Sequence, residues 1–144
     1  MNGTVSFFSE GISFALPQKT KTKNWIKKVI GGNEKSCGVI NYIFCSDSFL
    51  FDLNKNYLNH TTLTDIITFD NSEGDSVSGD IYISIERVKE NSGLYSQSFT
   101  DELNRVMIHG VLHLLGNKDK LPEEKSAMRK KEDYCLALLS ALNA

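Results

Sequence analysis

The sequence predicts an α/β (α+β) fold in which helices pack around a single mixed sheet of four to five strands. Short segments dense in β-branched and aromatic residues, such as residues 38–44 (GVINYIF), alternate with segments whose apolar residues recur every three or four positions. The first pattern is typical of buried strands and the second of helices with one apolar face. At 144 residues the chain is long enough to bury a core, and we expect one domain over residues 1–144.

Four regions are expected to form strands. The first lies within residues 5–16, as one or two pieces interrupted near residues 9–11, and the others are residues 38–44, 65–69 and 80–84. Residues 70–79 (DNSEGDSVSG) are polar and contain glycine, which indicates a loop.

Helix starts are predicted from side chains that can accept a hydrogen bond from the first free N–H groups of a helix. In chain order the candidates are Thr22 or Asn24, Ser46 or Asp47, and Thr100. The first helix is expected to end at residues 31–32. The second is expected to carry an apolar stripe made of Phe49, Leu50, Leu53 and Tyr57. A short helix is expected at residues 85–90 and should end at residues 91–93. The last helix begins at Pro122, whose ring suits a first helical turn; it is expected to bury Met128, Cys135, Leu138, Leu139 and Leu142.

The composition is that of an ordinary soluble protein, with 40% hydrophobic and 24% charged residues. No stretch is long and apolar enough to cross a membrane, and the first residues lack the basic and apolar regions of a signal peptide. Because no Cys-x-x-Cys spacing occurs, we interpret Cys37, Cys45 and Cys135 as reduced thiols. These features predict a cytoplasmic protein with no membrane partner.

The net charge of −2 argues against a protein that grips nucleic acid over its whole surface. The charge is nevertheless unevenly distributed. Residues 47–102 hold eleven acidic and three basic residues, residues 19–28 hold five lysines and no acid, and residues 118–131 hold six basic and three acidic residues. A charged run usually marks a solvated helix face, but the last segment also permits a phosphate-binding rim beside the motif described next.

Residues 106–120 (VMIHGVLHLLGNKDK) carry the clearest chemical pattern of the chain. His109 and His113 are four residues apart, so on a helix their imidazoles share one face. Gly116 follows where a helix end favours a left-handed residue, and Asp119 comes three residues later. Two imidazoles and a carboxylate can fill three corners of a tetrahedron and leave the fourth open to water or substrate, as in a catalytic zinc site.

The same residues also have simpler explanations. Two histidines at this spacing occur as a hydrogen-bonded pair without a metal, although an imidazole buried in an apolar helix without a partner is costly. Gly110 lies mid-helix, where glycine costs about 1 kcal/mol relative to alanine. A close approach by substrate or by another backbone explains that glycine, and so does tight helix packing.

Residues 109–119 (HGVLHLLGNKD) resemble the signature H-G-x-L-H-L-x-G-Y-D-H of the YbeY family, bacterial metal-dependent endoribonucleases of ribosomal RNA maturation. The spacing matches without a gap, but Asn117 replaces the usual tyrosine and Asp119 replaces the third histidine. The resemblance implies that His109, His113 and Asp119 hold one Zn²⁺ per chain, or Ni²⁺ or another divalent ion, because aspartate is also a zinc ligand.

Two further blocks extend the resemblance over roughly residues 37–140. Leu53-Asn54 with residues 64–69 (TDIITF) is similar to the family's L-N…T-D-V-L-S-F block, and residues 79–84 (GDIYIS) are similar to its G-D-I-x-I-S strand. Most members carry an arginine four or five residues after the L-N pair, which is thought to contact RNA phosphate. Leu58 stands there and cannot make a bidentate phosphate contact. His60 is either a partial substitute or an ordinary surface histidine.

The resemblance implies a single-strand-specific, metal-dependent endoribonuclease that acts in ribosomal RNA processing, at the 3′ end of 16S rRNA, and in ribosome quality control. Its partners would be single-stranded RNA, ribosomal RNA or the ribosome, with no DNA expected. A metal held by the three side chains would lower the pKa of its bound water toward about 7 and polarise a phosphoryl oxygen. Arg105 lies one turn before His109. It either contacts the metal ligands or the substrate phosphate, or it is an ordinary surface residue in a salt bridge.

Two other functions fit the same motif. A zinc-dependent peptidase-like hydrolase carries glutamate directly after the first histidine as its general base, and Gly110 stands at that position. A non-catalytic, ribosome-associated RNA-binding module would use a structural metal only to fix the helix end, and the leucine in place of the family arginine keeps this alternative open. Metal-dependent cleavage of single-stranded RNA separates the enzyme from the binding module.

Overall fold

The computed structural model describes residues 3–58 and 64–142. The elements are, in order, β1 (Thr4–Glu10), α1 (Lys19–Gly32), β2 (Ser36–Cys45), α2 (Asp47–Leu58), β3 (Ile66–Asp70), β4 (Ser76–Ser84), α3 (Ile85–Leu94), α4 (Phe99–Leu114) and α5 (Pro122–Leu142). The four strands described form one sheet in the order β1-β2-β4-β3, in which β3 is antiparallel to β4 and the other pairs are parallel. The predicted mixed sheet with helices around it is confirmed.

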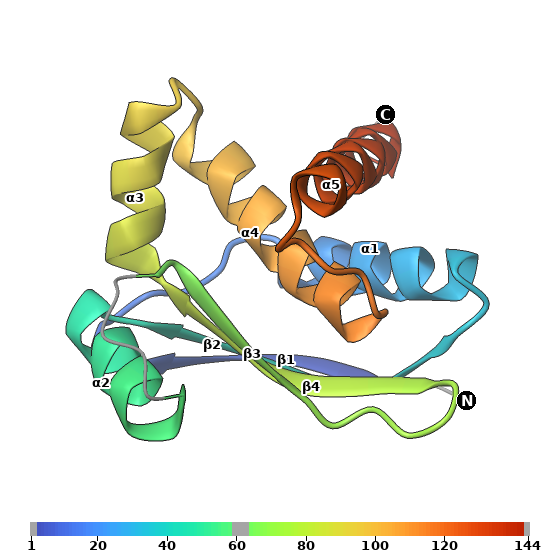
Figure 1. Ribbon diagram of the computed structural model, residues 1–144, viewed down its shortest axis with the longest axis horizontal. Helices are drawn as coiled ribbons and strands as arrows, with labels where there is room; N and C mark the ends of the chain where they lie inside the picture. The colour runs from blue at the N-terminus through green and yellow to red at the C-terminus, as the bar shows by residue number, and fades with distance from the viewer. Residues whose placement is uncertain (1–2, 59–63, 143–144) are drawn as a thin grey trace.

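The helices cover both faces of the sheet (Figure 1). Helices α1 and α4 lie on one face, α5 stacks on the outer side of α4, and α2 lies on the opposite face. The larger buried cluster fills the space under α1 and α4 and includes Trp25, Tyr42 and Met107. The smaller cluster joins Leu50 of α2 to Ile67 of β3. Helix α4 is therefore the central helix, held between the sheet and α5.

Strand β4 begins earlier than the sequence indicated. Residues 76–79, expected in a loop, continue the strand, with Val77 and Gly79 buried toward the same face as Ile81 and Ile83. The serines between them face the other way, so polar residues on one face concealed a strand whose other face is part of the core. Because β3 also includes Asp70, the predicted loop is correct only for residues 71–75.

Two of the predicted helix caps are wrong. Helix α4 begins after Ser98, whose Oγ accepts a hydrogen bond from the Asp101 N–H at 3.1 Å, and Thr100 lies inside the first turn. Helix α1 begins after Gln18, which makes no side-chain cap hydrogen bond, and the predicted cap Thr22 is buried inside the helix. By contrast, Ser46 caps α2 as predicted, because its Oγ accepts from the Phe49 N–H at 3.2 Å.

Two side chains are more exposed than the sequence predicted. Tyr57 of α2 is 72% exposed and Leu142 of α5 is 40% exposed, although both were expected on buried stripes. Helix α3 continues to Leu94 through its predicted stop, because Ser92 is buried and its hydroxyl donates to the Lys89 carbonyl within the helix.

All three cysteines are free, as predicted. In the described part of the chain no helix is long and apolar enough to cross a membrane.

Candidate metal centre

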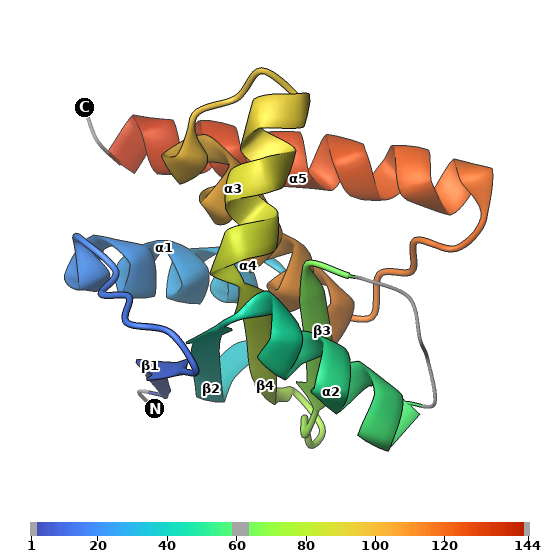
Figure 2. The same cartoon turned by 90° about the vertical axis from the view of Figure 1, so that its left-hand side faces the viewer.

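Helix α4 presents its two histidines at the edge of its buried face. Met107, Ile108 and Val111 are fully buried against the sheet and α5, whereas the His109 and His113 side chains are 21% and 31% exposed. Both imidazoles therefore reach the surface near the end of α4, where the helix lies against β3 (Figure 2). The helical spacing of four residues puts the two rings in contact, with centroids 4.6 Å apart.

The turn after α4 returns the chain toward these rings. Gly116 has φ of 97°, a conformation that a side chain would strain. Its N–H donates to the His113 carbonyl and the Asn117 N–H donates to the Leu112 carbonyl, which is the paired arrangement of a Schellman helix end. The predicted role of Gly116 is confirmed, and the reversal brings Asp119 back to the histidines.

His109, His113 and Asp119 converge at one point. The Asp119 Oδ2 atom lies 3.1 Å from His109 Nε2 and 3.2 Å from His113 Nε2, and the two Nε2 atoms are 3.0 Å apart. A tetrahedral site with metal–ligand bonds of about 2.0 Å has edges of about 3.3 Å between ligand atoms. The three atoms therefore have the spacing that one divalent ion requires, and within the described residues they form the one such cluster found.

The hydrogen-bond chemistry also favours a cation between these atoms. His109 Nδ1 lies 2.6 Å from Glu132 Oε2, and as a donor to this carboxylate Nδ1 carries the proton of a neutral imidazole. Nε2 of His109 then points a lone pair at His113 and Asp119, so acceptor atoms face one another and repel unless a proton or metal ion lies between them. The residues present thus fit a metal with two nitrogen ligands and one oxygen ligand.

Glu132 and Arg105 form a chain of contacts behind His109. Arg105 donates from Nη1 to Glu132 Oε1 at 2.8 Å and from Nη2 to Asp133 Oδ1 at 2.7 Å. Arg105 is therefore a salt-bridge residue that also acts on the site, through the carboxylate that orients His109. Glu132 is buried, with 5% of its surface exposed. Its burial is matched by two charge-assisted hydrogen bonds, without which a carboxylate at this position would be costly.

The pKa values of His109 and Glu132 are shifted in opposite directions. Burial of His109 opposes its charged form, but the hydrogen bond and charge of Glu132 outweigh burial and raise the pKa of His109. Burial likewise opposes the charge of Glu132, but hydrogen bonds from His109 and Arg105 lower the pKa of that carboxyl. In the metal-free protein the charged forms of the two groups therefore stabilise each other.

Two open cavities flank the three converging side chains. One, of about 810 Å³, lies beneath α5 and is lined by His109, Asp119, Lys125 and Arg129 among others. The other, of about 740 Å³, lies toward α2 and is lined by both histidines, Asp119 and Leu58. Leu58, at the position of the family arginine, therefore does border the site, with 41% of its surface exposed. His60 lies outside the described residues.

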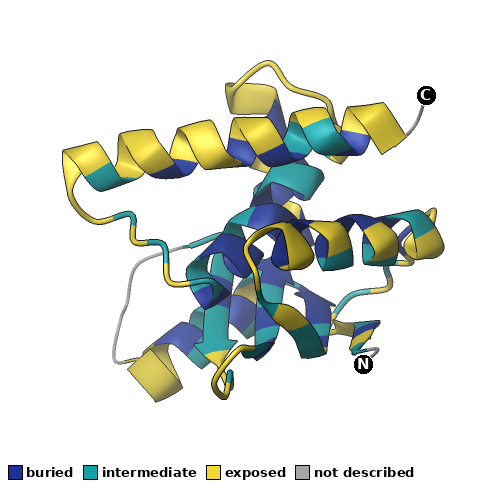
Figure 3. Ribbon diagram, turned by 90° about the vertical axis from the view of Figure 1, so that its right-hand side faces the viewer, coloured by how far each residue is buried: buried dark blue, intermediate teal, exposed yellow. Residues whose placement is uncertain are grey.

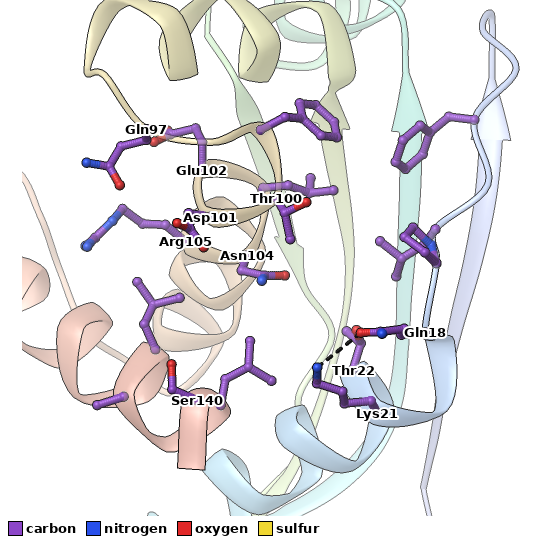
Figure 4. Close-up of a pocket in the computed structure, with 18 residues that line it drawn as sticks. Gln18, Lys21, Thr22, Gln97, Thr100, Asp101, Glu102, Asn104, Arg105 and Ser140 are labelled. Carbon is purple, nitrogen blue, oxygen red and sulfur yellow. Dashed lines mark hydrogen bonds between the residues drawn. The ribbon is translucent and has the colours of Figure 1, made fainter. Parts of the chain in front are cut away.

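A third cavity shares residues with the first of these cavities but contains none of the three candidate ligands. It has a volume of about 590 Å³ and lies between α1, α4 and α5 (Figure 4). Arg105 and Glu102 line it, but His109, His113 and Asp119 do not. Catalytic chemistry is thus better placed in the cavities that contain the convergent ligands.

Two carboxylates of the region were missed from the sequence. Glu132 falls on the buried face of α5 with Met128, Cys135 and Leu139, and a carboxylate on such a stripe is a signal of a buried ion pair. Asp65 borders both flanking cavities, and burial raises the pKa of its carboxyl. The TDIITF block contains Asp65, but a position at the start of a strand indicates no chemical role for it.

Gly110 is explained by packing. A Cβ atom at this position would lie 3.0 Å from Cδ1 and Cγ2 of Ile81 and 3.2 Å from Cδ1 of Ile66. The glycine therefore lets α4 approach the sheet closely. A side chain at position 110 would point at the sheet, because its nearest neighbours are these strand residues.

Known proteins of one family match most of this chain. Residues 10–140 match the model of the family described as Endoribonuclease YbeY. Proteins named Endoribonuclease YbeY from Flavobacterium psychrophilum and Christiangramia forsetii are 53% and 48% identical, covering 91% and 94% of this chain and 94% of each relative. The solution structure of a Thermotoga maritima protein has the same fold, with a TM-score of 0.64 at 23% identity over 96% of this chain and 93% of the other. The match over most of the length shows that the chain belongs to the YbeY family of endoribonucleases.

Proposed function

We propose that this protein is a metal-dependent endoribonuclease that cuts single-stranded RNA in the cytoplasm during ribosomal RNA processing, including maturation of the 3′ end of 16S rRNA and ribosome quality control. His109, His113 and Asp119 hold one divalent ion, with Zn²⁺ the best match to two imidazoles and a carboxylate. The observation that carries this proposal is the convergence of three ligand atoms within 3.2 Å of one another beside open cavities, in a chain of the YbeY family.

The protein's own groups prepare the site for phosphodiester cleavage. A bound divalent ion supplies Lewis acidity toward water and a phosphoryl oxygen. Glu132 holds His109 in the tautomer whose Nε2 is a free ligand atom, and Arg105 holds Glu132. The carboxyl of Asp65, with its raised pKa, borders the same space and can exchange a proton at the leaving oxygen.

Substrate phosphate needs a cation other than the family arginine. Lys125 and Arg129 are four residues apart on α5, so they share a face, and both line the cavity that contains His109 and Asp119. Both are exposed, and neither has an ion-pair partner among the described residues. We assign them the phosphate contact that Leu58 cannot make, because guanidinium and ammonium groups bind phosphate through charge-assisted hydrogen bonds.

The peptidase alternative lacks its general base. In the motif H-E-x-x-H the base follows the first histidine, and position 110 here faces Ile81 of the sheet instead of a cavity. The binding-module alternative makes a different prediction, namely that metal removal lowers thermal stability without changing the affinity for RNA.

Cleavage of a labelled single-stranded RNA by the zinc-loaded protein tests the proposal. The wild type should cut the single strand and leave a duplex of the same sequence intact, and His113→Ala should be inactive. Glu123→Ala is a matched control, because Glu123 is an exposed carboxylate at the start of α5 and lines none of the cavities described. Equal cleavage by the wild type and His113→Ala would contradict the assignment.

A further inference from the structure

A groove between α1 and α5 combines the features of a single-stranded nucleic-acid site. It has a volume of about 420 Å³ and an apolar floor that includes Val29, Leu112 and Cys135. Its rim carries three ammonium groups and one aromatic ring, from Lys28, Lys130, Lys131 and Tyr134. Figure 3 shows the two helices side by side on this face of the molecule.

The groove joins the two basic segments of the chain. Lys28 ends the lysine-rich residues 19–28, and Lys130 and Lys131 end the basic residues 118–131. No acidic residue lines the groove, and none of the three lysines has an ion-pair partner within the described parts of the chain. In a protein whose net charge is −2, three lysines around one groove create a local positive field.

Tyr134 supplies a stacking surface beside these cations. Its side chain is 72% exposed although it borders an apolar floor. Nucleic-acid sites that accept any sequence combine such an exposed ring, on which a base stacks, with lysines that contact the backbone. The phenol ring and the apolar floor suit a base, and the three ammonium groups suit the phosphates on either side of it.

A residue that lines the groove is hydrogen-bonded to the turn that follows α4. Lys131 Nζ donates to the Asn117 side-chain oxygen, and Asn117 Nδ2 donates to the carbonyl of Leu112 at 3.0 Å. Asn117 lies two residues before Asp119, so the wall of the groove and the candidate metal centre share one turn of chain. This contact places the groove beside the turn that carries Asp119.

We infer that the α1–α5 groove is a second RNA-binding subsite, in which Tyr134 stacks on a base while Lys28, Lys130 and Lys131 contact phosphates of the strand outside the cleavage position. The inference rests on the proposed RNA-cleaving function for its choice of occupant. It adds a contact region on a face of the molecule apart from the two cavities that flank the ligands. The alternative is that the lysine stems merely cover apolar surface.

Fluorescence anisotropy with a labelled oligouridylate of about 16 nucleotides tests the subsite, in EDTA so that the RNA stays intact. Tyr134→Ala should weaken binding about tenfold, and Tyr134→Phe should restore it because phenylalanine also stacks. Lys28→Gln/Lys130→Gln should lower the slope of log affinity against log salt by about 1.4, because each phosphate that a lysine neutralises adds about 0.7 to that slope. Lys19→Gln/Lys89→Gln, with the same net charge but exposed positions elsewhere, should bind like the wild type.

Wild-type affinity in Tyr134→Ala and an unchanged salt slope in the double lysine variant would overturn the subsite. Equal weakening by the Lys19→Gln/Lys89→Gln control would also overturn it, because the effect would then be one of net charge alone. Binding is measured without metal, so no RNA is cleaved in this experiment. A failure of the subsite is therefore distinct from a failure of the proposed nuclease activity, in which the zinc-loaded wild type would leave RNA uncut.

Discussion

The Glu132 carboxylate lies 2.6 Å from Nδ1 of His109, although the two residues are 23 positions apart in the sequence. This contact links α5 to the face of α4 that carries the candidate ligands and sets which imidazole nitrogen is free to bind a cation. Carboxylates placed behind a ligating histidine typically contribute about 10- to 100-fold in metal affinity.

Glu132→Gln should therefore weaken zinc binding by about 10- to 100-fold while leaving the three ligand side chains in place. Competition with a fluorescent zinc chelator measures the change. Asp133→Asn is the matched control, because Asp133 pairs with the same Arg105 but is 59% exposed and does not contact His109. Similar zinc affinities in Glu132→Gln and Asp133→Asn would show that the His109 contact has no role in binding.

Stability of the metal-free protein should depend on pH through the same pair. The pKa of His109 is raised above its ordinary value of 6.5. Its contribution to folding stability is therefore complete when the pH is below 6.5, and it is lost as the pH rises through the raised pKa. The pKa of Glu132 is lowered, so its contribution is complete above the ordinary value of 4.5 and is lost as pH falls through the lowered pKa. The difference in Tm between the wild type and Glu132→Gln should thus be largest between pH 4.5 and 6.5.

Thermal melts in EDTA at a series of pH values measure this difference. Zinc affinity should follow the opposite trend and increase with pH, because a proton on His109 competes with the metal. A Tm difference that grows steadily above about pH 7 would contradict the ion pair.

Gly110→Ala should lower the free energy of unfolding by about 1 kcal/mol, because overpacking at Ile81 and Ile66 outweighs the gain in helix propensity. Urea denaturation measures the effect. Gly31→Ala is the control: Gly31 lies in α1 with no atom within 4 Å of an added Cβ, so alanine should stabilise by about 0.5–1 kcal/mol. Equal stabilisation by both substitutions would show that Gly110 is not required for packing.

Arg129→Ala should raise the KM for single-stranded RNA about tenfold with a smaller change in kcat, because a charge-assisted contact to phosphate acts mainly in binding. Arg129→Lys should recover part of the binding, since lysine keeps the charge without the bidentate geometry. Steady-state cleavage of a labelled single strand measures both constants. An unchanged KM in Arg129→Ala would remove this residue from the substrate contact.

Local patterns predicted the parts of the site that depend on local structure. The spacing of His109 and His113 fixes their common face on any helix, and Gly116 signals the reversal that returns Asp119 to them. The three candidate ligands, His109, His113 and Asp119, all lie within eleven consecutive residues. The backbone hydrogen bonds that close the turn at Gly116 also lie within this segment.

The remaining features depend on contacts between distant segments. Glu132 is recognisable as a partner of His109 only when α5 is placed over α4, and Lys28 meets Lys130 only when α5 also lies beside α1. The start of β4 was hidden because its serines face away from the core, so its pairing with β2 determines the strand. Pairing across the sheet, and not local propensity, sets such boundaries.

The stoichiometry of zinc tests most directly whether the three side chains form one metal centre. Elemental analysis after gel filtration should find about one zinc per chain in the wild type and in Glu123→Ala, and much less than one in His109→Ala, His113→Ala and Asp119→Ala. Circular dichroism confirms that each variant is folded. Equal zinc content in the wild type and in the folded ligand variants would contradict the assignment of His109, His113 and Asp119.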